Sequence, residues 1–261
     1  MATRRTVVLS GAGLSTDSGI PDYRGPESPP RTPMTYQQFV GDPDFRRHYW
    51  ARNHLGWRHM DAARPNDGHR AVAALEREGR IGGVITQNVD LLHTKAGSRR
   101  VIDLHGTYAQ VRCLSCRQLI SRWALAERLE ALNPGFGGDG AAIQVAPDAD
   151  AVLSDTAGFR VADCERCGGL LKPDIVYFGE NVPPARVQAA YDLVDNAELL
   201  LVVGSSLHVM SGLRFVRHAA KLGIPVAIVN RGPTRGDDLA TLKLDAGCSQ
   251  TLSDLLALAT F

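Results

Sequence analysis

The 261-residue sequence predicts an α/β fold built around a doubly wound parallel sheet. Two observations predict it: short apolar runs that end in glycine or polar turns, and intervening segments with apolar residues three or four positions apart. Continuous apolar runs are typical of strands buried on both faces of a parallel sheet. The second spacing is typical of amphipathic helices. Strands that alternate with helices imply right-handed crossovers and helices on both faces of the sheet.

The expected elements follow one another along the chain. Strands are expected at Thr6–Leu9, Val84–Thr86, Val101–Leu104, Ile175–Phe178, Leu199–Val203 and Val226–Val229. Helical spacing occurs at His69–Glu78, Ala185–Val194 and Leu213–Leu222. Two stretches break the alternation. They are 34–67, an aromatic- and Arg-rich insertion with a helix expected around Phe45–Trp57, and 109–170, which contains four paired cysteines and a long Gly- and Pro-containing loop at 133–150.

The composition excludes several classes of protein. Hydrophobic residues make up 44% and charged residues 22%, which is ordinary for a globular chain. A formal net charge of +1 provides no global field for nucleic acid or an anionic membrane. The longest low-charge apolar stretch, Leu199–Leu213, is shorter than the about 20 residues that span a bilayer. Because the start lacks the features of a signal peptide, we expect a cytoplasmic protein without disulfides.

The first motif is a glycine turn after the first expected strand. Gly11-Ala12-Gly13 lies where open α/β sheets bind ligands and where a following helix offers N–H groups to a phosphate. A nucleotide diphosphate fits such a site, although a plain strand-to-helix turn has the same sequence. Thr16 replaces the third glycine of the dinucleotide fingerprint, which counts against a hydride-transfer dehydrogenase. Shortly after the turn, Asp22, Tyr23 and Arg24 could line a cofactor pocket or form a surface loop.

Polar residues also follow other expected strands. Gln87, Asn88 and Asp90 come directly after one of them, so they should face the same crevice as the glycine turn; a helix-capping role is the alternative for Asn88 or Asp90. His105 precedes a glycine at another strand end. It is either a structural histidine or a general base, because imidazole titrates near neutral pH. Further along, the polar residues at strand ends are Gly204, Ser205, Ser206 and Asn230, which suit a ribose or phosphate.

The cysteines provide the most specific signal. Cys113 and Cys116 form one CxxC hook, and Cys164 and Cys167 form a second. Each hook can present two thiolates to one tetrahedral ion, so we expect zinc; a redox CxxC pair is the competing interpretation. Four thiolates leave no open coordination position, which makes the metal structural. Cys248 has no such partner and is expected to be a small buried residue.

Taken together, the motifs resemble the sirtuins, the NAD-dependent protein lysine deacylases. The motifs GAGLSTDSGIPDYR, TQNVD, His105-Gly106, the two CxxC hooks, KPDIVYFGE, VGSSL and VNR occur in the order found in that family, across nearly the whole chain. The stretches YWARNHLGW and GPTRGDDLATLKL look like the class II branch.

The resemblance implies a division of the chain into domains. Residues 1–33, 68–108 and 171–261 would form a Rossmann-like NAD-binding domain, the doubly wound parallel sheet. A smaller domain would consist of a helical module at 34–67 and a zinc-binding module at 109–170 with a long loop at 133–163.

The resemblance also implies roles for residues. His105 would be the general base, with Asn88 as a second catalytic residue. NAD, the co-substrate, would be held by Gly11, Ala12, Gly13, Ser15, Asp22, Tyr23, Arg24, Gln87, Asn88, Asp90, Gly204, Ser205, Ser206 and Asn230. The acyl-lysine protein substrate would bind by strand addition to Val176, Phe178 and Gly179. Tyr49 and Arg52 resemble the pair with which desuccinylating sirtuins hold an acyl carboxylate, although Arg52 on a solvated helix face is the alternative.

Other functions use the same site. Protein mono-ADP-ribosyl transfer would cleave NAD in the same way but with a different acceptor, and a third possibility is a catalytically silent NAD or ADP-ribose sensor. The presence of His105, Asn88 and Asp90 disfavours the sensor. We expect acidic branched or long acyl groups to be preferred over acetyl, and a monomer that binds neither nucleic acid nor membrane.

Overall fold

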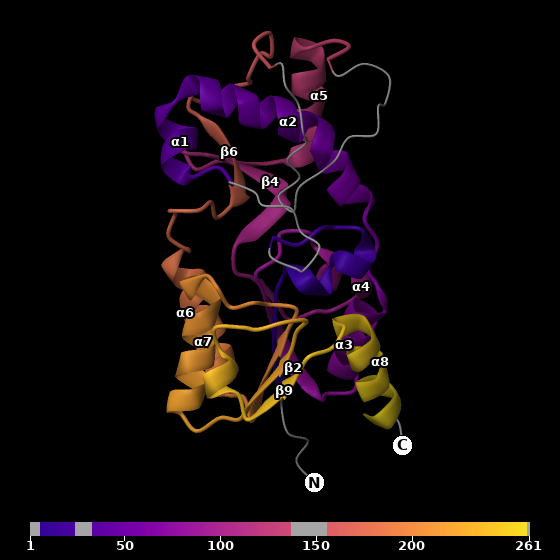
Figure 1. Ribbon diagram of the computed structural model, residues 1–261. Helices are drawn as coiled ribbons and strands as arrows, with labels where there is room; N and C mark the ends of the chain where they lie inside the picture. Colours follow the sequence, from indigo (N-terminus) through magenta and orange to yellow (C-terminus); the bar gives the residue numbers. More distant parts are fainter. Residues whose placement is uncertain (1–5, 24–32, 137–155, 260–261) are drawn as a thin grey trace. The chain divides into compact units, whose positions relative to one another are not determined.

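The computed structural model describes residues 6–23, 33–136 and 156–259, which belong to two compact units (Figure 1). The large unit contains the described residues of 6–23, 63–105 and 182–259. The small unit contains those of 33–62, 106–136 and 156–181. Each unit has its own sheet.

The large unit is built on a six-stranded parallel sheet in the order β3-β2-β1-β7-β8-β9. Counted within this sheet, the order is 3-2-1-4-5-6, that of dinucleotide-binding folds, and it reverses direction between β1 and β7. The predicted doubly wound parallel sheet is confirmed. The strands are β1 (Thr6–Ser10), β2 (Ile81–Thr86), β3 (Val101–Asp103), β7 (Leu199–Val203), β8 (Val226–Val229) and β9 (Leu242–Leu244).

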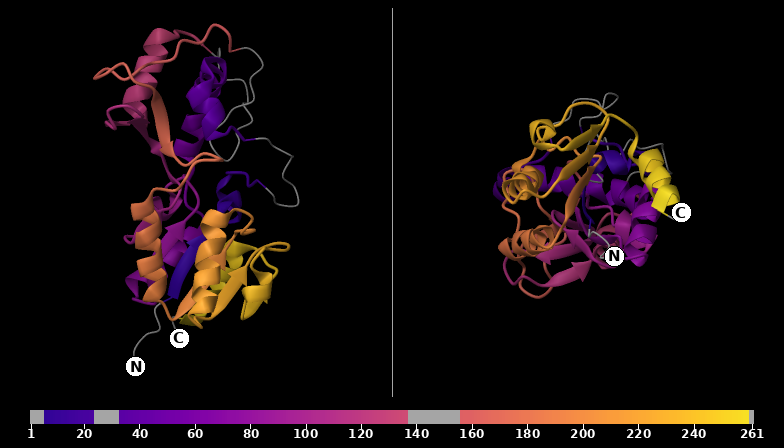
Figure 2. Two further views of the ribbon diagram at one scale, coloured as in Figure 1. Left: turned by 90° about the vertical axis from the view of Figure 1, so that its left-hand side faces the viewer. Right: turned by 90° about the horizontal axis from the view of Figure 1, so that it is seen from below.

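Alternate residues of the central strands enter two hydrophobic cores. Val7 and Leu9 of β1 face the core formed with α6 (Pro184–Asp195) and α7 (Met210–Lys221). Val8 faces the opposite core, formed with α3 (Asp67–Arg77) and α8 (Cys248–Ala259). Because successive strand side chains point to opposite faces, a sheet covered on both faces requires the continuous apolar runs seen in the sequence. Figure 2 shows these helices on the two sides of the sheet.

The small unit has a three-stranded antiparallel sheet in the order β5-β4-β6. Its strands are β4 (Gly106–Cys113), β5 (Leu119–Ser121) and β6 (Leu171–Ile175), and its helices are α1 (Tyr36–Gly41), α2 (Pro43–Ala62) and α5 (Arg122–Leu132). The prediction of a parallel-sheet strand at 175–178 is wrong: the strand ends at Ile175 and pairs antiparallel with β4. Polar residues hid the true strand, because Lys172 and Asp174 are buried with charged partners.

The helix starts of the small unit follow from local side-chain chemistry. Thr35 and Gln38 form a reciprocal capping box on α1. Pro43 begins α2, where a missing N–H costs no hydrogen bond, and Ser121 accepts from the Ala124 N–H at the start of α5. The helix predicted around 45–57 is therefore present as α2.

Helix α2 buries aromatic side chains in the small unit. Tyr49 lies 5.5 Å, between ring centroids, from both Phe39 and Tyr177. Arg122 is 1% exposed, and its guanidinium carbon lies 4.8 Å from the ring centroid of Trp57. Contacts of this kind let a planar cation enter an apolar core.

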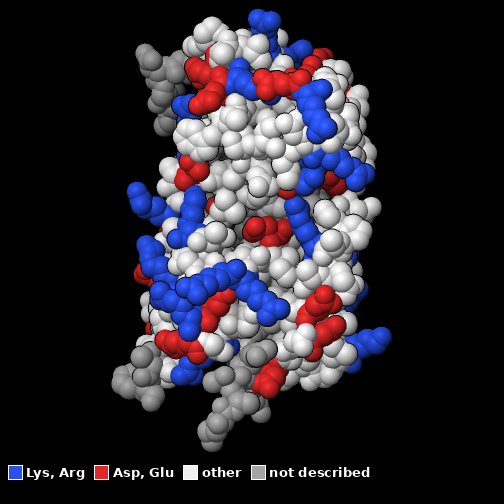
Figure 3. All heavy atoms as spheres, turned by 180° about the vertical axis from the view of Figure 1, so that it is seen from behind, with Lys and Arg blue, Asp and Glu red and all other residues white. Residues whose placement is uncertain are grey.

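The surface carries charges of both signs. Figure 3 shows basic and acidic side chains interspersed on the face that it presents, in keeping with the net charge of +1. No helix among the described residues is long and apolar enough to cross a membrane.

Two histidines of the large unit, His69 of α3 and His93 of α4 (Leu92–Ala96), are buried side by side. The His69 and His93 ring centroids lie 5.0 Å apart, and the two residues are 0% and 2% exposed. Nδ1 of His69 lies 2.9 Å from Oδ1 of Asn66, and Nε2 of His93 lies 2.9 Å from Oγ of Ser10. Burial lowers the pKa of His69 to about 2 and that of His93 to about 4. Both rings are therefore neutral in the folded protein near neutral pH.

This pair predicts a pH-dependent stability. Below about pH 6.5 the two histidines bind protons in the unfolded chain but not in the folded one. The contribution of the pair to the free energy of unfolding therefore decreases as the pH is lowered. His93→Gln should reduce the loss of unfolding free energy between about pH 7 and about pH 5 by roughly 2 kcal/mol. All three tryptophans lie in the small unit, so unfolding of the large unit in urea should be followed by hydrogen exchange of its backbone amides. His59→Gln, at an exposed site, is the control, and equal losses in all three proteins would contradict the prediction.

Candidate active site and metal centre

Two glycine turns meet where the strand order of the large sheet reverses. The Gly13 N–H donates to the Gly204 carbonyl at 2.9 Å, and the Gly11 N–H donates to the Val203 carbonyl at 3.0 Å. A Cβ on Gly13 would lie 3.0 Å from the Gly204 oxygen. At Gly204 itself, with φ +62°, a Cβ would lie 2.2 Å from the Leu14 nitrogen. Both positions require glycine because the two backbones touch.

The segment after the first turn differs from the expectation of one helix. It forms two short 3₁₀ helices, Ala12–Leu14 and Thr16–Ser18. The second ends at Gly19, which has a positive φ of 80°. Ser15 lies between the two, as the C-cap of the first and the N-cap of the second.

Ser15, Asn88 and Asp90 form one hydrogen-bonded network. The Ser15 hydroxyl donates to Oδ2 of Asp90 at 2.6 Å, and Nδ2 of Asn88 lies 3.0 Å from both Ser15 Oγ and the Gly11 carbonyl oxygen. Asp90 is 4% exposed. Burial raises the pKa of the Asp90 carboxyl, whereas hydrogen bonds from Ser15 and from the Leu92 N–H act in the opposite direction. The structure thus brings together three residues that the sequence placed on two strand ends.

Gln87 connects the turn after β7 to His105. Its Nε2 donates to Oγ of Ser205 at 2.8 Å, and its backbone oxygen lies 2.9 Å from Nδ1 of His105. Nε2 of His105 lies 2.8 Å from Oγ of Ser211. Burial, together with the nearby charges of Arg186 and Arg214, lowers the pKa of His105 to about 4, against the effect of the Gln87 carbonyl. A neutral imidazole at the carboxyl edge of a parallel sheet can accept a proton.

The remaining predicted NAD residues lie in more local settings. Asn230 follows β8, and its amide donates to the carbonyls of Arg231 and Gly232. Ser206 accepts the Arg235 N–H through its carbonyl. Asp22 and Tyr23 are partly exposed, and Arg24 lies outside the described residues.

The predicted substrate segment follows β6 in the small unit. The Phe178 carbonyl accepts the Tyr36 N–H at 2.9 Å, and the Gly179 carbonyl accepts from Nε2 of Gln37 at 3.3 Å. Val176 and Phe178 are half-buried, whereas Tyr177 between them is buried. The alternation is that of an extended chain with one face on the core.

A buried lysine holds this segment in place. Nζ of Lys172 lies 3.0 Å from Oε2 of Glu180 and donates to the Ile175 carbonyl. The same carboxylate oxygen accepts the Tyr177 N–H at 2.9 Å. Desolvation lowers the pKa of Lys172, and the Glu180 carboxylate opposes this effect. The ion pair therefore closes the turn that contains Val176, Phe178 and Gly179.

Tyr49 and Arg52 have different surroundings on α2. Tyr49 is 2% exposed and packs in the aromatic core. Nη1 of Arg52 lies 3.1 Å from Nε2 of His48, whose Nδ1 lies 3.0 Å from Oγ1 of Thr156. Their proposed contact with an acyl carboxylate stays a prediction.

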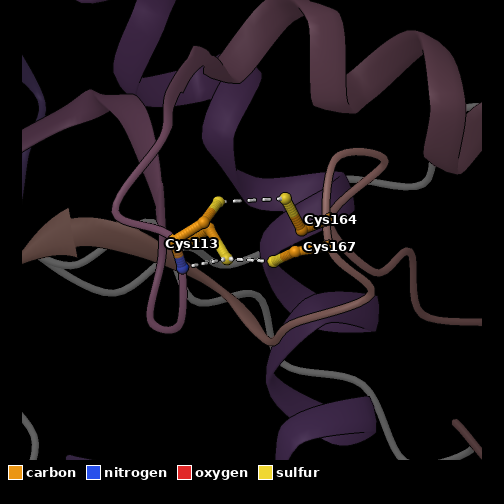
Figure 4. Close-up of side chains that lie close together, drawn as sticks. Cys113, Cys164 and Cys167 are labelled. Carbon is orange, nitrogen blue, oxygen red and sulfur yellow. Dashed lines mark hydrogen bonds between the residues drawn. The ribbon is translucent and has the colours of Figure 1, made fainter.

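The four paired cysteines gather at one end of the small sheet (Figure 4). Their sulfur atoms all lie within 4.8 Å of one another. Cys113 Sγ is 3.5 Å from Cys167 Sγ, and Cys116 Sγ is 3.7 Å from Cys164 Sγ. A tetrahedral zinc ion with Zn–S bonds of about 2.3 Å separates its sulfurs by about 3.8 Å. The four thiols are therefore positioned to bind zinc.

The backbone of each hook explains how the thiols converge. The residue after the second cysteine has a positive φ in both hooks: 60° at Arg117 and 67° at Gly168. Glycine suits this conformation, and the first hook adopts it with arginine. At Gly169, a Cβ would lie 2.4 Å from Oγ of Ser115 and 3.0 Å from Sγ of Cys113, so the second hook packs against the first.

Two features of the site were missed from the sequence. Ser211 contacts His105 from the first turn of α7, and the only signal was a hydroxyl shortly after the strand-end sequence Gly204–Leu207. The ion pair of Lys172 with Glu180 could have been suspected from opposite charges that flank an apolar segment.

A parallel sheet in this strand order, with polar residues gathered at its switch point, defines an α/β protein of the dinucleotide-binding class. Residues 11–211 match the model of the Sir2 family. The chain is 69% identical over 260 residues to NAD-dependent protein deacetylase 1 of Mycobacterium avium, a match that covers 97% of this chain and 91% of that protein. It is 59% identical over 242 residues to NAD-dependent protein deacetylase 1 of Streptomyces coelicolor, with coverage of 91% and 80%.

Solved structures agree with these matches. A complex described as Sir2 with a p53 peptide and NAD+ superposes with a TM-score of 0.78 at 32% identity, covering 99% of this chain and 95% of that chain. A structure described as Sir2 bound to acetylated peptide gives a TM-score of 0.72 at 31% identity, covering 99% and 94%. The chain belongs to the Sir2 family, as its motifs predict.

The metal centre predicts the behaviour of Cys164→Ser. Loss of one thiolate should release zinc and lower the unfolding free energy of the small unit, because metal binding contributes directly to folding. Metal content should be measured after gel filtration, and tryptophan fluorescence reports on this unit alone. The control is Cys248→Ser, which changes a buried cysteine of the large unit; this variant protein should bind as much zinc as the wild type. Full zinc occupancy in Cys164→Ser would contradict the assignment.

Proposed function

We propose that this chain is an NAD-dependent protein lysine deacylase, which transfers the acyl group from lysine to ADP-ribose and releases nicotinamide. The observation that carries the proposal is His105, a neutral imidazole with Nδ1 on a carbonyl, among the polar strand ends of a Sir2-family sheet. Both relatives described above are named NAD-dependent protein deacetylases.

NAD would bind at the carboxyl edge of the large sheet. The turn Gly11-Ala12-Gly13 and Ser15 would meet its phosphates, since glycine allows a close backbone approach. Gln87, Asn88 and Asp90, with Asp22, Tyr23 and Arg24, would surround the nicotinamide and its ribose. The adenosine half would contact Gly204, Ser205, Ser206 and Asn230. The support is the strand order and the two networks that join Ser15 to Asp90 and Gln87 to Ser205.

The chemistry divides between NAD and the chain. When bound, NAD supplies an electrophilic ribose carbon as its bond to nicotinamide breaks, and the acyl oxygen of the substrate attacks that carbon. Nε2 of His105 then takes a proton from a ribose hydroxyl, while Nδ1 keeps its own proton on the Gln87 carbonyl. Asn88 orients the ribose from a position fixed by Ser15 and Gly11. Zinc held by Cys113, Cys116, Cys164 and Cys167 would have no open coordination position and would take no part in the reaction.

The acyl-lysine peptide would add as a strand to Val176–Gly179. Main-chain hydrogen bonds would hold the peptide, and the half-buried side chains of Val176 and Phe178 would shape the neighbouring pockets. Lys172 and Glu180 support this segment from below the turn. Membership of the class II branch, a cytoplasmic location, a monomeric state and the absence of nucleic-acid binding rest on the sequence alone.

The base predicts the outcome of His105→Ala. NAD-dependent deacylation should fall by roughly 10² to 10⁴-fold, while the zinc content and circular dichroism stay those of the wild type. Product analysis by mass spectrometry should find acyl-ADP-ribose with the wild type; label retained on protein would indicate ADP-ribosyl transfer. His59→Ala, at an exposed site of the small unit, is the matched control. Unchanged turnover in His105→Ala would show that the base is misassigned.

The acyl preference is tested with a panel of acyl-lysine peptides. We expect acidic branched or long acyl groups to be turned over faster than acetyl, and Arg52→Gln to reduce turnover of the acidic ones selectively. Arg47→Gln, on the same helix, removes a half-buried arginine paired with Asp44 and should change no preference. Acetyl as the best substrate by a wide margin would defeat this expectation.

A further inference from the structure

Both ring nitrogens of His105 have partners within the large unit. Nδ1 lies 2.9 Å from the Gln87 carbonyl oxygen and Nε2 lies 2.8 Å from the Ser211 hydroxyl. A carbonyl oxygen can only accept, so Nδ1 carries the hydrogen, and the neutral ring then presents a lone pair at Nε2. The Ser211 hydroxyl therefore donates to Nε2.

The chain places this hydroxyl through the first turn of α7. Ser211 is the second residue of the helix, and no side chain caps its start at Val209. The next residue is Gly212, where a Cβ would lie 2.6 Å from Oε1 of Gln87. The turn thus packs on Gln87 with Gly212 and reaches His105 with Ser211. A larger residue than glycine would displace the Gln87 carboxamide, which donates to Oγ of Ser205.

We propose that Ser211 is a positioning residue for His105: its hydroxyl fixes the imidazole in one tautomer and one orientation before the substrate binds. The role rests on the proposed function, in which Nε2 accepts a proton. A histidine ring rotates in a broad well about its Cβ–Cγ bond, and hydrogen bonds at both nitrogens confine that rotation. Nε2 has one lone pair, so the substrate hydroxyl replaces Ser211 at a ring that is already aligned.

The same bond affects protonation. A hydroxyl that donates to Nε2 stabilises the neutral ring, and on protonation of the ring it has to turn and accept instead. The loss of this donor should therefore raise the pKa of His105. Other groups act on this ring as well. Desolvation lowers the pKa, as do Arg186 of α6 and Arg214 of α7, and the Gln87 carbonyl raises it. Asp103, two residues away at the end of β3, is a further titratable group on this edge.

The experiment compares Ser211→Ala with the wild type by two readouts. The first is the NMR titration of isotope-labelled imidazole in the free protein, with the His105 signal assigned through its loss in His105→Gln. Ser211→Ala should raise the pKa of His105 by about half to one pH unit. The second is the pH profile of kcat/KM for deacylation, whose acid limb should move upward by the same shift, with a plateau roughly fivefold lower.

Two further variants complete the design. Ser211→Thr keeps the hydroxyl and should titrate like the wild type. Ser253→Ala removes a hydroxyl of α8 that donates to the Ser249 carbonyl, and it should change neither readout. An unchanged titration in Ser211→Ala would overturn the proposal, and so would a Ser211→Thr protein that titrates like Ser211→Ala. The NMR readout needs no turnover, so an inactive wild type would refute the proposed function and still leave the Ser211 contact tested.

Discussion

The contact between the backbones of two glycine turns sets the geometry of the large unit's site. Gly13 donates to Gly204 at 2.9 Å, and neither position has space for a side chain. Because the two turns follow neighbouring strands, their contact fixes where each chain leaves the sheet. Ser15 follows from the first turn and Ser205 from the second. Each of these hydroxyls then bonds to a residue that follows β2, so three strand ends form one polar edge.

Polar side chains on this edge are fixed by one another before any ligand binds. Asp90 is buried, yet it accepts from Ser15 and from a backbone N–H, which offsets part of the cost of its burial. Asn88 is held by the same hydroxyl and by a carbonyl. Such an arrangement presents aligned donors to a ligand without a further loss of side-chain entropy. The imidazole of His105, held at both nitrogens, follows the same rule.

Local chemistry decides how far the sequence predicts this structure. Apolar runs such as Leu199–Val203 give the strands of the parallel sheet, since burial on both faces excludes polar residues. The spacing of the two CxxC hooks also predicts that they lie together, because four thiolates can bind one metal ion. Strand β6 escaped prediction: Lys172 and Asp174 are stabilised by Glu180 and Arg112, and such partners are invisible without the fold. The Ser211 contact escaped for the same reason, since its partner lies 106 residues away.

In the small unit, strand β6 connects the metal centre directly to the predicted substrate segment. Gly169, against which Cys113 packs, stands two residues before β6, and β6 leads directly into Val176. The sheet has only three strands, two of them five residues or shorter, so its own hydrogen bonds give limited stability. The four thiolates fix one end of β6, and Lys172 with Glu180 fixes the other. Zinc bound by the four thiolates would therefore act on the proposed peptide-binding segment through the position of one strand.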